Sequence, residues 1–427
     1  MTTAHASDLA IVRGPLDWDE FTAQYWDRRP VLIKAVRPAP FESREVFAAT
    51  AAATRPPGPH LMPPTAQFAV GRFQQSEPAD WFPRAGDGAF DGYRRRLDAE
   101  LAAFSAERRY ALVVHAFHAF HAEQWERQRA FFDPLWERTG LPVSGPITTL
   151  FHGNYEHTPV GVHRDRFATF LFALEGHKRM RFWRECPWTE PVTTKLDYQD
   201  HLAASFTAEP EPGDLLYWPA SYYHVGESVD GRAATSVNVG VPREAHRAVY
   251  DVDDLLLGRT PDAMVDPDAA LVRLPTATAP LSVPEPPPDG ALPEALEQTL
   301  RLLQEYRDPA RMRERVAELS LRNLSASGLC PVPPPGAPQP LEDGTAVRAR
   351  ARVLYQPADG TLLVAANGHL LRSPLTQHQV RPLLRRLAEP KPVPVGDLLA
   401  ALPPAARADA RHLLETLESF RALTRDR

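Results

Sequence analysis

The sequence of 427 residues holds only two cysteines, Cys186 and Cys330, and they lie far apart. Two distant cysteines supply no disulfide framework, so the sequence favours a reducing compartment. No run approaches the roughly 20 apolar residues that a helix needs to cross a bilayer, and the first residues lack the charged segment and apolar core of a secretory signal. We therefore expect a cytoplasmic protein that does not enter a membrane.

Signatures of two large enzyme classes are also missing. The sequence has no GxGxxG, no phosphate loop and no GxSxG elbow, so nothing supports nucleotide binding or serine hydrolysis. Proline, in contrast, is abundant, with 45 residues. Prolines gather at 274–290 and 330–340, where they cannot continue a helix or a central strand, and these stretches predict extended linkers. They divide the chain into three predicted parts, residues 1–250, 251–340 and 341–427.

The three parts differ in their apolar pattern, and together they predict an α+β protein. Between 147 and 241, short apolar runs separated by Gly, Pro and Asp indicate an antiparallel β-barrel or sandwich, preceded by a helix at 121–140. The middle part has helical spacing at 291–324. In the last part, the turn pairs Asp359-Gly360 and Asn367-Gly368 predict paired strands. Three helical patterns follow, so this part resembles a winged-helix module.

One apolar stretch, GVHRDRFATFLFALEGHKRMRFW (161–183), contains polar residues at regular spacing. Residues two apart in a strand share a face, so His163 and Asp165 would point the same way, and Thr169 would join them. A turn at 175–177 then leads into a returning strand that begins with Lys178. The spacing therefore predicts that all four side chains face one pocket.

A second stretch, EPGDLLYWPASYYHVGES (211–228), offers a third candidate ligand, His224, 59 residues after Asp165. Two imidazoles and one carboxylate on one face of a metal are typical of mononuclear iron sites that activate oxygen. The aromatic residues near His224 are candidates to line a substrate cleft, with core packing as the alternative for Trp218: Tyr217, Trp218, Tyr222 and Tyr223. We thus predict a metal site of His163, Asp165 and His224.

Three further histidines, His115, His118 and His121, are spaced three residues apart. This spacing can bring imidazoles together on a helix. They straddle a predicted junction between strand and helix, however, and lack a carboxylate or cysteine partner. We do not expect a metal site there.

The two motifs resemble the core motifs of the JmjC-type cupin oxygenases, whose catalytic domain is a double-stranded β-helix, or jelly-roll. The spacing and the segment EGHKR are most similar to the bacterial ribosomal-oxygenase branch, the cupin-like protein hydroxylases. The entry segment FTAQYWDRRPVLI resembles the N-terminal helix and strand of that family. The resemblance implies a helical dimerisation segment, a C-terminal winged helix and a homodimer.

The resemblance also assigns roles to individual residues. It makes His163, Asp165 and His224 the ligands of Fe(II), and it places Lys178 against the distal carboxylate of the cosubstrate 2-oxoglutarate, with O2 as second cosubstrate. A lysine reaching outward to solvent is the alternative. Further implied cosubstrate contacts, with turn or strand roles open for the last three, are Thr169, Thr158, Asn154 and Asn238. Two departures concern the substrate: a short loop at 158–163, and Arg164 in place of an aromatic residue.

The implied reaction hydroxylates a side chain in a protein or peptide and releases succinate and CO2. A ribosomal protein and the precursor peptide of a natural product are the two candidate substrates. An alternative is a ligand-sensing regulator with a DNA-binding winged helix, because residues 346–427 carry 13 basic and 7 acidic side chains. The basic cluster of Arg381, Arg385 and Arg386 is modest, so we expect no nucleic-acid partner. A small-molecule cupin dioxygenase, which would need neither Lys178 nor 2-oxoglutarate, is a further alternative.

Overall fold

The computed structural model describes residues 9–55, 66–76, 78–104, 108–142, 145–243, 304 and 309–426. The chain forms two compact units, one of residues 1–245 and 326–334 and the other of residues 246–325 and 335–427. The linker predicted at 274–290, and half of the helical pattern predicted at 291–324, lie outside the described residues. The division into three parts therefore stays a prediction.

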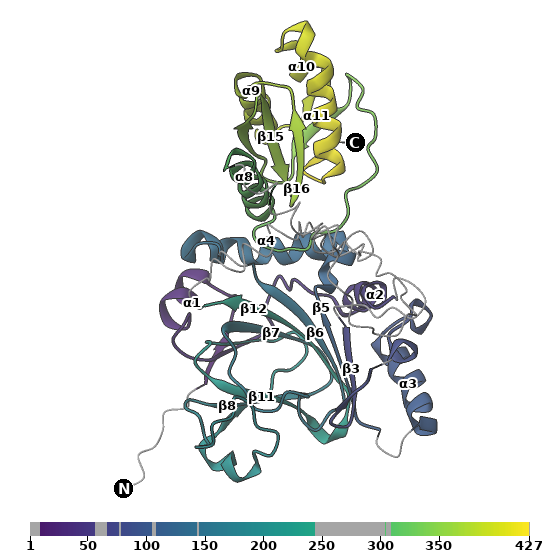
Figure 1. Cartoon of the computed structure of the whole chain (residues 1–427), viewed down its shortest axis with the longest axis vertical. Helices are drawn as coiled ribbons and strands as arrows, with labels where there is room; N and C mark the ends of the chain where they lie inside the picture. Colours follow the sequence, from purple (N-terminus) through teal and green to yellow (C-terminus); the bar gives the residue numbers. More distant parts are fainter. Residues whose placement is uncertain are drawn as a thin grey trace, which may run out of the picture. The chain divides into compact units, whose positions relative to one another are not determined.

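The first unit is built on two β-sheets that face each other. Among the described residues, the large sheet has nine strands in the order β1-β2-β10-β7-β12-β6-β5-β3-β4, and the small sheet has three, β11-β8-β9. The large sheet curves over the small one (Figure 1). All neighbours run antiparallel except β1 and β2. The predicted antiparallel sandwich is confirmed, and its form is consistent with a jelly-roll catalytic domain.

The strands of the large sheet are β1 (Ala10–Arg13), β2 (Val31–Lys34), β3 (Ala66–Val70), β4 (Phe73–Gln74), β5 (Tyr110–His115), β6 (Ile147–Gly153), β7 (Phe167–Glu175), β10 (Leu215–Trp218) and β12 (Ala234–Pro242). Those of the small sheet are β8 (Lys178–Trp183), β9 (Phe206–Ala208) and β11 (Tyr223–Ser228). The helices are α1 (Trp18–Gln24), α2 (Ser43–Ala53), α3 (Phe90–Phe104) and α4 (Ala122–Thr139).

Alternation along β7 separates an outer core from an inner face. Phe170 and Phe172 belong to the core that includes side chains of all four helices, and α4 runs along this outer side of the large sheet (Figure 1). Thr169, Leu171 and Ala173 point the opposite way, and the last two pack with residues of the small sheet. The helices therefore cover one face of the large sheet, while its other face lines the interior of the sandwich.

Local sequence signals account for where the two predicted helices of this unit begin. The Asp17 carboxylate accepts hydrogen bonds from the backbone N–H groups of Asp19 and Glu20, at 2.8 and 3.0 Å, and caps α1. His121 Nδ1 accepts from the N–H of Gln124 at 3.3 Å and caps α4. Both predicted helices are confirmed.

A segment from late in the chain completes the first unit. Residues 326–334 pack on α4, where Trp125 forms a buried cluster with Ala326, Leu329 and Val332. Trp125 Nε1 donates a hydrogen bond to the Leu329 carbonyl at 2.8 Å. The proline-rich stretch predicted at 330–340 is thus divided, because its first residues belong to the first unit.

The described part of the second unit contains four helices and two small sheets. The helices are α8 (Pro309–Ser325), α9 (Gln377–Leu387), α10 (Val395–Ala400) and α11 (Arg407–Ser419). One sheet holds β14 (Leu354–Ala358), β15 (Thr361–Ala366) and β16 (His369–Ser373), and the other holds β13 (Ala346–Ala349), β17 (Val393–Pro394) and β18 (Leu423–Arg425). Among the described residues, no helix has both the length and the apolar character to cross a membrane.

The two predicted hairpins of this unit are confirmed. Asp359, Gly360, Asn367 and Gly368 all have positive φ, between 38° and 80°, as tight turns between antiparallel strands require. The winged-helix assignment stays a prediction.

Phe170 is the residue on which we test the outer core. It is fully buried, and its ring centroid lies 4.9 to 6.3 Å from those of five aromatic residues: Trp18, Phe21, Trp26, Phe132 and Tyr217. We expect Phe170→Ala to lower the free energy of unfolding by about 3–5 kcal/mol, measured by urea denaturation. The control is Phe73→Ala, because Phe73 is 78% exposed. A similar loss in both variants would contradict this packing.

Candidate active site

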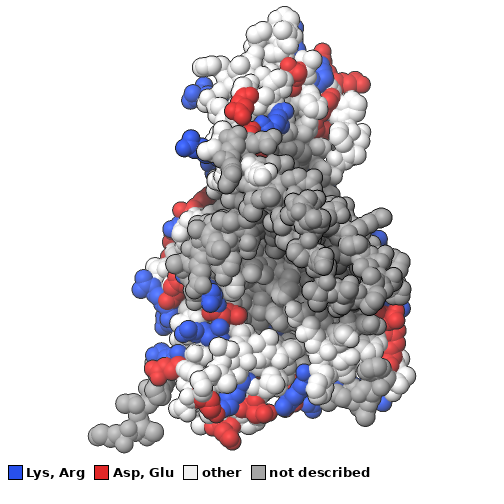
Figure 2. All heavy atoms as spheres, in the orientation of Figure 1, with Lys and Arg blue, Asp and Glu red and all other residues white. Residues whose placement is uncertain are grey.

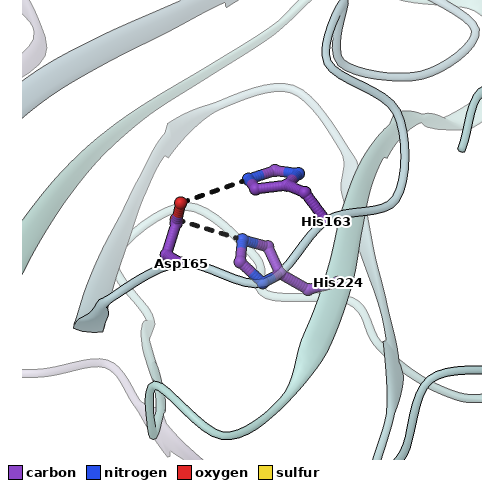
Figure 3. Close-up of side chains that lie close together, drawn as sticks. All are labelled: His163, Asp165 and His224. Atoms are coloured by element: carbon purple, nitrogen blue, oxygen red, sulfur yellow. Dashed lines mark ion pairs between the residues drawn. The ribbon is translucent and has the colours of Figure 1, made fainter. Parts of the chain in front are cut away.

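Three side chains from distant segments converge in the interior of the first unit. His163 and Asp165 precede β7, and His224 lies on β11. The Nε2 atoms of His163 and His224 lie 3.5 Å from Asp165 Oδ1 and Oδ2, respectively (Figure 3). The candidate ligand atoms all lie within 4.8 Å of one another, and no other such group of three occurs among the described residues. The structure thus brings together the three residues that the motifs singled out.

The backbone around His163 and Asp165 differs from the predicted continuous strand, which is a correction. β7 begins only at Phe167, whereas His163 forms an isolated bridge with His224, with N–H···O distances of 3.1 and 2.8 Å. Residues 164–166 cross from the small sheet to the large one, so strand alternation does not hold there. The crossing and the bridge, not alternation, bring the two motifs together.

Each imidazole is oriented by its other ring nitrogen. His163 Nδ1 donates to the Gly161 carbonyl at 2.9 Å, and His224 Nδ1 donates to the Tyr222 carbonyl at 3.3 Å. In the neutral rings these bonds leave the lone pair of both Nε2 atoms directed toward Asp165, whereas a protonated ring donates its Nε2–H to the carboxylate (Figure 3). This is how histidines that bind metals are commonly fixed.

The charges of the three groups suit a divalent cation. Burial lowers the pKa of His224, and the charge of His163 lowers it further. Burial also opposes protonation of His163, but the hydrogen bond and charge of Asp165 outweigh it and raise that pKa. For Asp165, burial is outweighed by the hydrogen bond from His163 and the charges of both imidazoles, which lower the pKa. A carboxylate flanked by two imidazoles is the donor set of non-haem Fe(II) sites.

Lys178, the first residue of β8, is buried without a counter-ion. Its side chain is 4% exposed, and no described carboxylate forms an ion pair with it. Its Nζ donates to Ser236 Oγ at 2.9 Å and lies 4.7 and 5.9 Å from the ring centroids of Phe151 and Tyr155. Burial lowers the pKa of Lys178 to about 7. The outward-reaching alternative is therefore wrong, and an anion bound here would stabilise the charged amine.

Two hydroxyl groups near Lys178 also lack partners. Tyr155 OH and Thr158 Oγ1 are buried with no hydrogen-bond partner. A Cβ atom at Gly226 would lie 3.0 Å from Lys178 Cε and 3.2 Å from Thr158 Cγ2, which places Thr158 beside Lys178. The glycine leaves the space that the lysine side chain occupies. Together these groups form a buried cluster of one amine and two unpaired hydroxyl groups.

The inner face of the large sheet contributes further polar groups. Ser236 and Asn238 alternate with valines of the outer core, so both face inward, as does Thr169 on β7. Asn238 Oδ1 is buried with no partner. Thr169 and Asn238 were predicted from the sequence as cosubstrate contacts, whereas Ser236, Tyr155 and Gly226 were not. For Ser236 a signal existed, because it lies two positions before Asn238 and shares its face.

Asn154 is engaged elsewhere. Its side-chain oxygen accepts from the Tyr110 N–H at 2.9 Å, and its side-chain nitrogen donates to the Arg108 carbonyl at 3.3 Å. Both ends of the amide thus bind the backbone at the start of β5. This matches the turn role that the sequence left open, and we leave Asn154 out of the cosubstrate contacts proposed below.

The four aromatic residues near His224 lie on different faces of the two sheets. The Trp218 ring centroid lies 5.0 Å from that of His224, and Trp218 packs with Tyr222 in the interior. Tyr217 lies in the outer core, so its assignment to a substrate cleft is wrong. Tyr223 lies on the face of β11 opposite to His224, with the Arg164 guanidinium 5.5 Å from its ring centroid. Arg164, which stands where the family has an aromatic residue, therefore lies against the outer face of the small sheet.

The three histidines that are spaced three residues apart in the sequence have separate contacts. His115 Nδ1 forms a hydrogen bond with Thr149 Oγ1 at 2.9 Å, His121 caps α4, and His118 is buried in the turn between them.

The lowered pKa of Lys178 predicts a dependence of stability on pH. Below about pH 7 the folded protein must hold a buried charge at full cost, and the cost fades as pH rises toward the ordinary value of 10.5. We expect Lys178→Met to be more stable than the wild type, by a margin about 2 kcal/mol larger at pH 7 than at pH 9. Urea unfolding of the metal-free protein measures this, with exposed Lys391→Met as control. An equal margin at both pH values would contradict the assignment.

Known proteins are similar to this chain in sequence and in fold. Residues 126–247 match the family model of the JmjC domain. Ribosomal protein uL16 3-hydroxylase of Escherichia coli (strain K12) is 22% identical over 343 residues, covering 77% of this chain and 78% of the relative. A solved structure of YcfD, a ribosomal oxygenase from Escherichia coli, is 17% identical with a TM-score of 0.47, covering 96% of this chain and 98% of that chain.

A further structure of YcfD, in complex with cobalt and 2-oxoglutarate, is 16% identical with a TM-score of 0.45, covering 96% of this chain and 99% of that chain. The family-model match spans both sequence motifs, with the three converging residues and Lys178 inside it. Residues 126–247 are therefore similar to the JmjC domain, as the two motifs indicated.

Proposed function

We propose that the protein is an Fe(II)- and 2-oxoglutarate-dependent oxygenase that hydroxylates a side chain of a ribosomal protein. The observation that carries this proposal is the pairing, within one interior, of a two-histidine, one-carboxylate group with a buried lysine that has no described carboxylate partner. A small-molecule cupin dioxygenase would need no such lysine.

His163, Asp165 and His224 would hold the iron. Bound there, Fe(II) would supply the reductive activation of O2 that couples decarboxylation of 2-oxoglutarate to hydroxylation. The backbone carbonyls of Gly161 and Tyr222 keep both imidazoles oriented, so the donors need little rearrangement on metal binding.

Lys178 would bind the distal carboxylate of 2-oxoglutarate. Ser236, Thr158 and Tyr155 surround the amine with hydroxyl groups, two of which have no partner and can donate to a carboxylate. The pKa near 7 means that the amine gains its full charge when the anion binds. Thr169 and Asn238 complete the proposed cosubstrate contacts from the inner face of the large sheet.

Apolar side chains would keep water away from the reacting groups. Leu171, Phe182 and Trp218 belong to one buried cluster between the sheets, and the rings of Phe182 and Trp218 lie 6.5 and 5.0 Å from that of His224. A dry surrounding strengthens the attraction between Lys178 and a carboxylate.

The substrate class rests on the relative. The curated relative is a hydroxylase of ribosomal protein uL16, which supports a ribosomal protein as the first candidate here. A precursor peptide of a natural product is the second candidate. Mass spectrometry after turnover separates them, because hydroxylation adds one oxygen atom to one substrate and leaves the other unchanged.

The DNA-binding regulator is the less favoured function. On the face shown in Figure 2, basic and acidic side chains are interspersed on the described part of the second unit, with uncharged surface between them. Duplex DNA binding needs a basic surface that follows the phosphates. We retain homodimer formation through the helical segment, and a cytoplasmic location, as proposals.

Removal of one metal ligand should abolish the reaction. We expect His163→Ala, Asp165→Ala and His224→Ala each to lose succinate formation and Mn(II) binding, measured by mass spectrometry and electron paramagnetic resonance. The loss should exceed the roughly 10- to 100-fold effect of removing an outer hydrogen-bond partner. The control is His177→Ala, since His177 is exposed in the turn between β7 and β8. Normal turnover in any of the three variants would refute the ligand set.

The cosubstrate pocket predicts a second set of effects. With Mn(II) present, the affinity for the analogue N-oxalylglycine should fall as pH rises above about 7, because Lys178 must be protonated. Lys178→Met should remove this dependence and most of the affinity. Gly226→Ala should weaken binding by displacing Lys178, whereas Gly344→Ala, where a Cβ meets nothing within 4 Å, should not. Calorimetry tests all three, and unchanged binding in Lys178→Met would disprove the anchor.

A further inference from the structure

A row of three polar side chains crosses the inner face of the large sheet beside the cosubstrate pocket. Asn238 on β12 is paired with Thr149 on β6, which is paired with His115 on β5. Their neighbours along each strand belong to the outer core, so all three side chains point inward: Val237, Val239, Leu150 and Val114. The row begins at a proposed cosubstrate contact and extends two strands away from it.

This row contains hydrogen-bonding atoms that have no partner among the described residues. Asn238 Oδ1 is buried without a partner, and His115 is bonded to Thr149 only through Nδ1, at 2.9 Å. Burial lowers the pKa of His115, so its ring is neutral at neutral pH. Because the Thr149 hydroxyl can donate or accept, His115 Nε2 can present either an N–H donor or a lone pair.

The cosubstrate can accept a hydrogen bond from the side-chain nitrogen of Asn238, but it cannot pair with the side-chain oxygen. Every oxygen of the 2-oxoglutarate dianion is an acceptor, so it has nothing to donate to Asn238 Oδ1. An unpaired buried acceptor costs about 1–3 kcal/mol, so a group with an N–H is expected to complete it. An acceptor at one end and a neutral imidazole at the other match an amide, which carries one N–H and one C=O.

We propose that Asn238, Thr149 and His115 bind an amide group of the substrate and thereby position the polypeptide beside the metal. The inference rests on the proposed oxygenase function and assigns its substrate side. An amide of the main chain and the side-chain amide of Asn or Gln have the same chemistry, and they are distinguished below. His115 and Thr149 are positioning residues, because they orient the substrate and do not touch the reacting oxygen.

Two adjacent threonines of β6 give a matched pair of variants. Thr149 faces inward to His115, whereas the Thr148 hydroxyl accepts a hydrogen bond from Gln128 Nε2 among the outer helices. Thr149→Val and Thr148→Val make the same chemical change on opposite faces of one strand. His115→Phe removes the imidazole, and His115→Gln restores a polar group.

The probes are overlapping synthetic peptides that span Escherichia coli uL16 and a pool of randomised peptides. The readouts are peptide-stimulated succinate formation, the KM for the peptide and the KM for 2-oxoglutarate. We expect Thr149→Val and His115→Phe to raise the peptide KM about tenfold, as loss of one hydrogen bond does, with less than about a twofold change for 2-oxoglutarate. Thr148→Val should alter neither constant, and His115→Gln should recover part of the peptide KM.

Ester replacement of one main-chain amide at a time identifies the source. Loss of stimulation at one position indicates a main-chain amide, and a requirement for Asn or Gln at one position indicates a side-chain amide. An unchanged peptide KM in Thr149→Val and His115→Phe, or an equal rise in Thr148→Val, overturns the inference. So does a wild type that forms succinate without stimulation by any peptide. A wild type that forms no succinate at all overturns the proposed function, and the inference with it.

Discussion

The cost of burying the amine of Lys178 is the constraint around which the interior of the first unit is arranged. An ammonium group between two β-sheets loses its hydration, and one hydrogen bond to Ser236 does not replace it. The pocket therefore suits an anionic ligand, which would supply the missing charge. Gly226 leaves room for the lysine, and unpaired hydroxyl groups lie around it.

The central strands of the large sheet contribute core side chains on one face and candidate-site side chains on the other. On β7, Phe170 packs among the aromatic residues beneath the helices, while Thr169 faces the interior. On β12, Val237 and Val239 belong to the outer core, while Ser236 and Asn238 point inward. Because side chains alternate, the outer face can be fully apolar without restricting the inner one. Changes of substrate specificity can thus occur on the inner face with little loss of stability.

How much could be predicted from the sequence depends on the range of the interaction. The turn pairs of the second unit, the helix at 121–140 and the β8 strand were predicted because each is decided by neighbouring residues. From the sequence, the side chain of Tyr217 was placed wrongly and the role of Asn154 was left open. In both cases the partner lies far away in the chain: Phe21 for Tyr217 and Tyr110 for Asn154. The return of residues 326–334 to the first unit was missed for the same reason, since its contact with Trp125 spans 204 residues.

The sequence alone singled out the candidate site residues: two motifs supply His163, Asp165, Lys178 and His224, and their residue types restrict the possible metals and ligands. The tertiary structure decided how these residues meet. Residues 164–166 pass from one sheet to the other, and only the bridge between His163 and His224 sets the ligand distances. Strand periodicity is a property of a single chain segment, whereas the packing of two sheets against each other depends on the whole unit. Only folding could therefore bring the candidate metal ligands, the lysine and the polar row together.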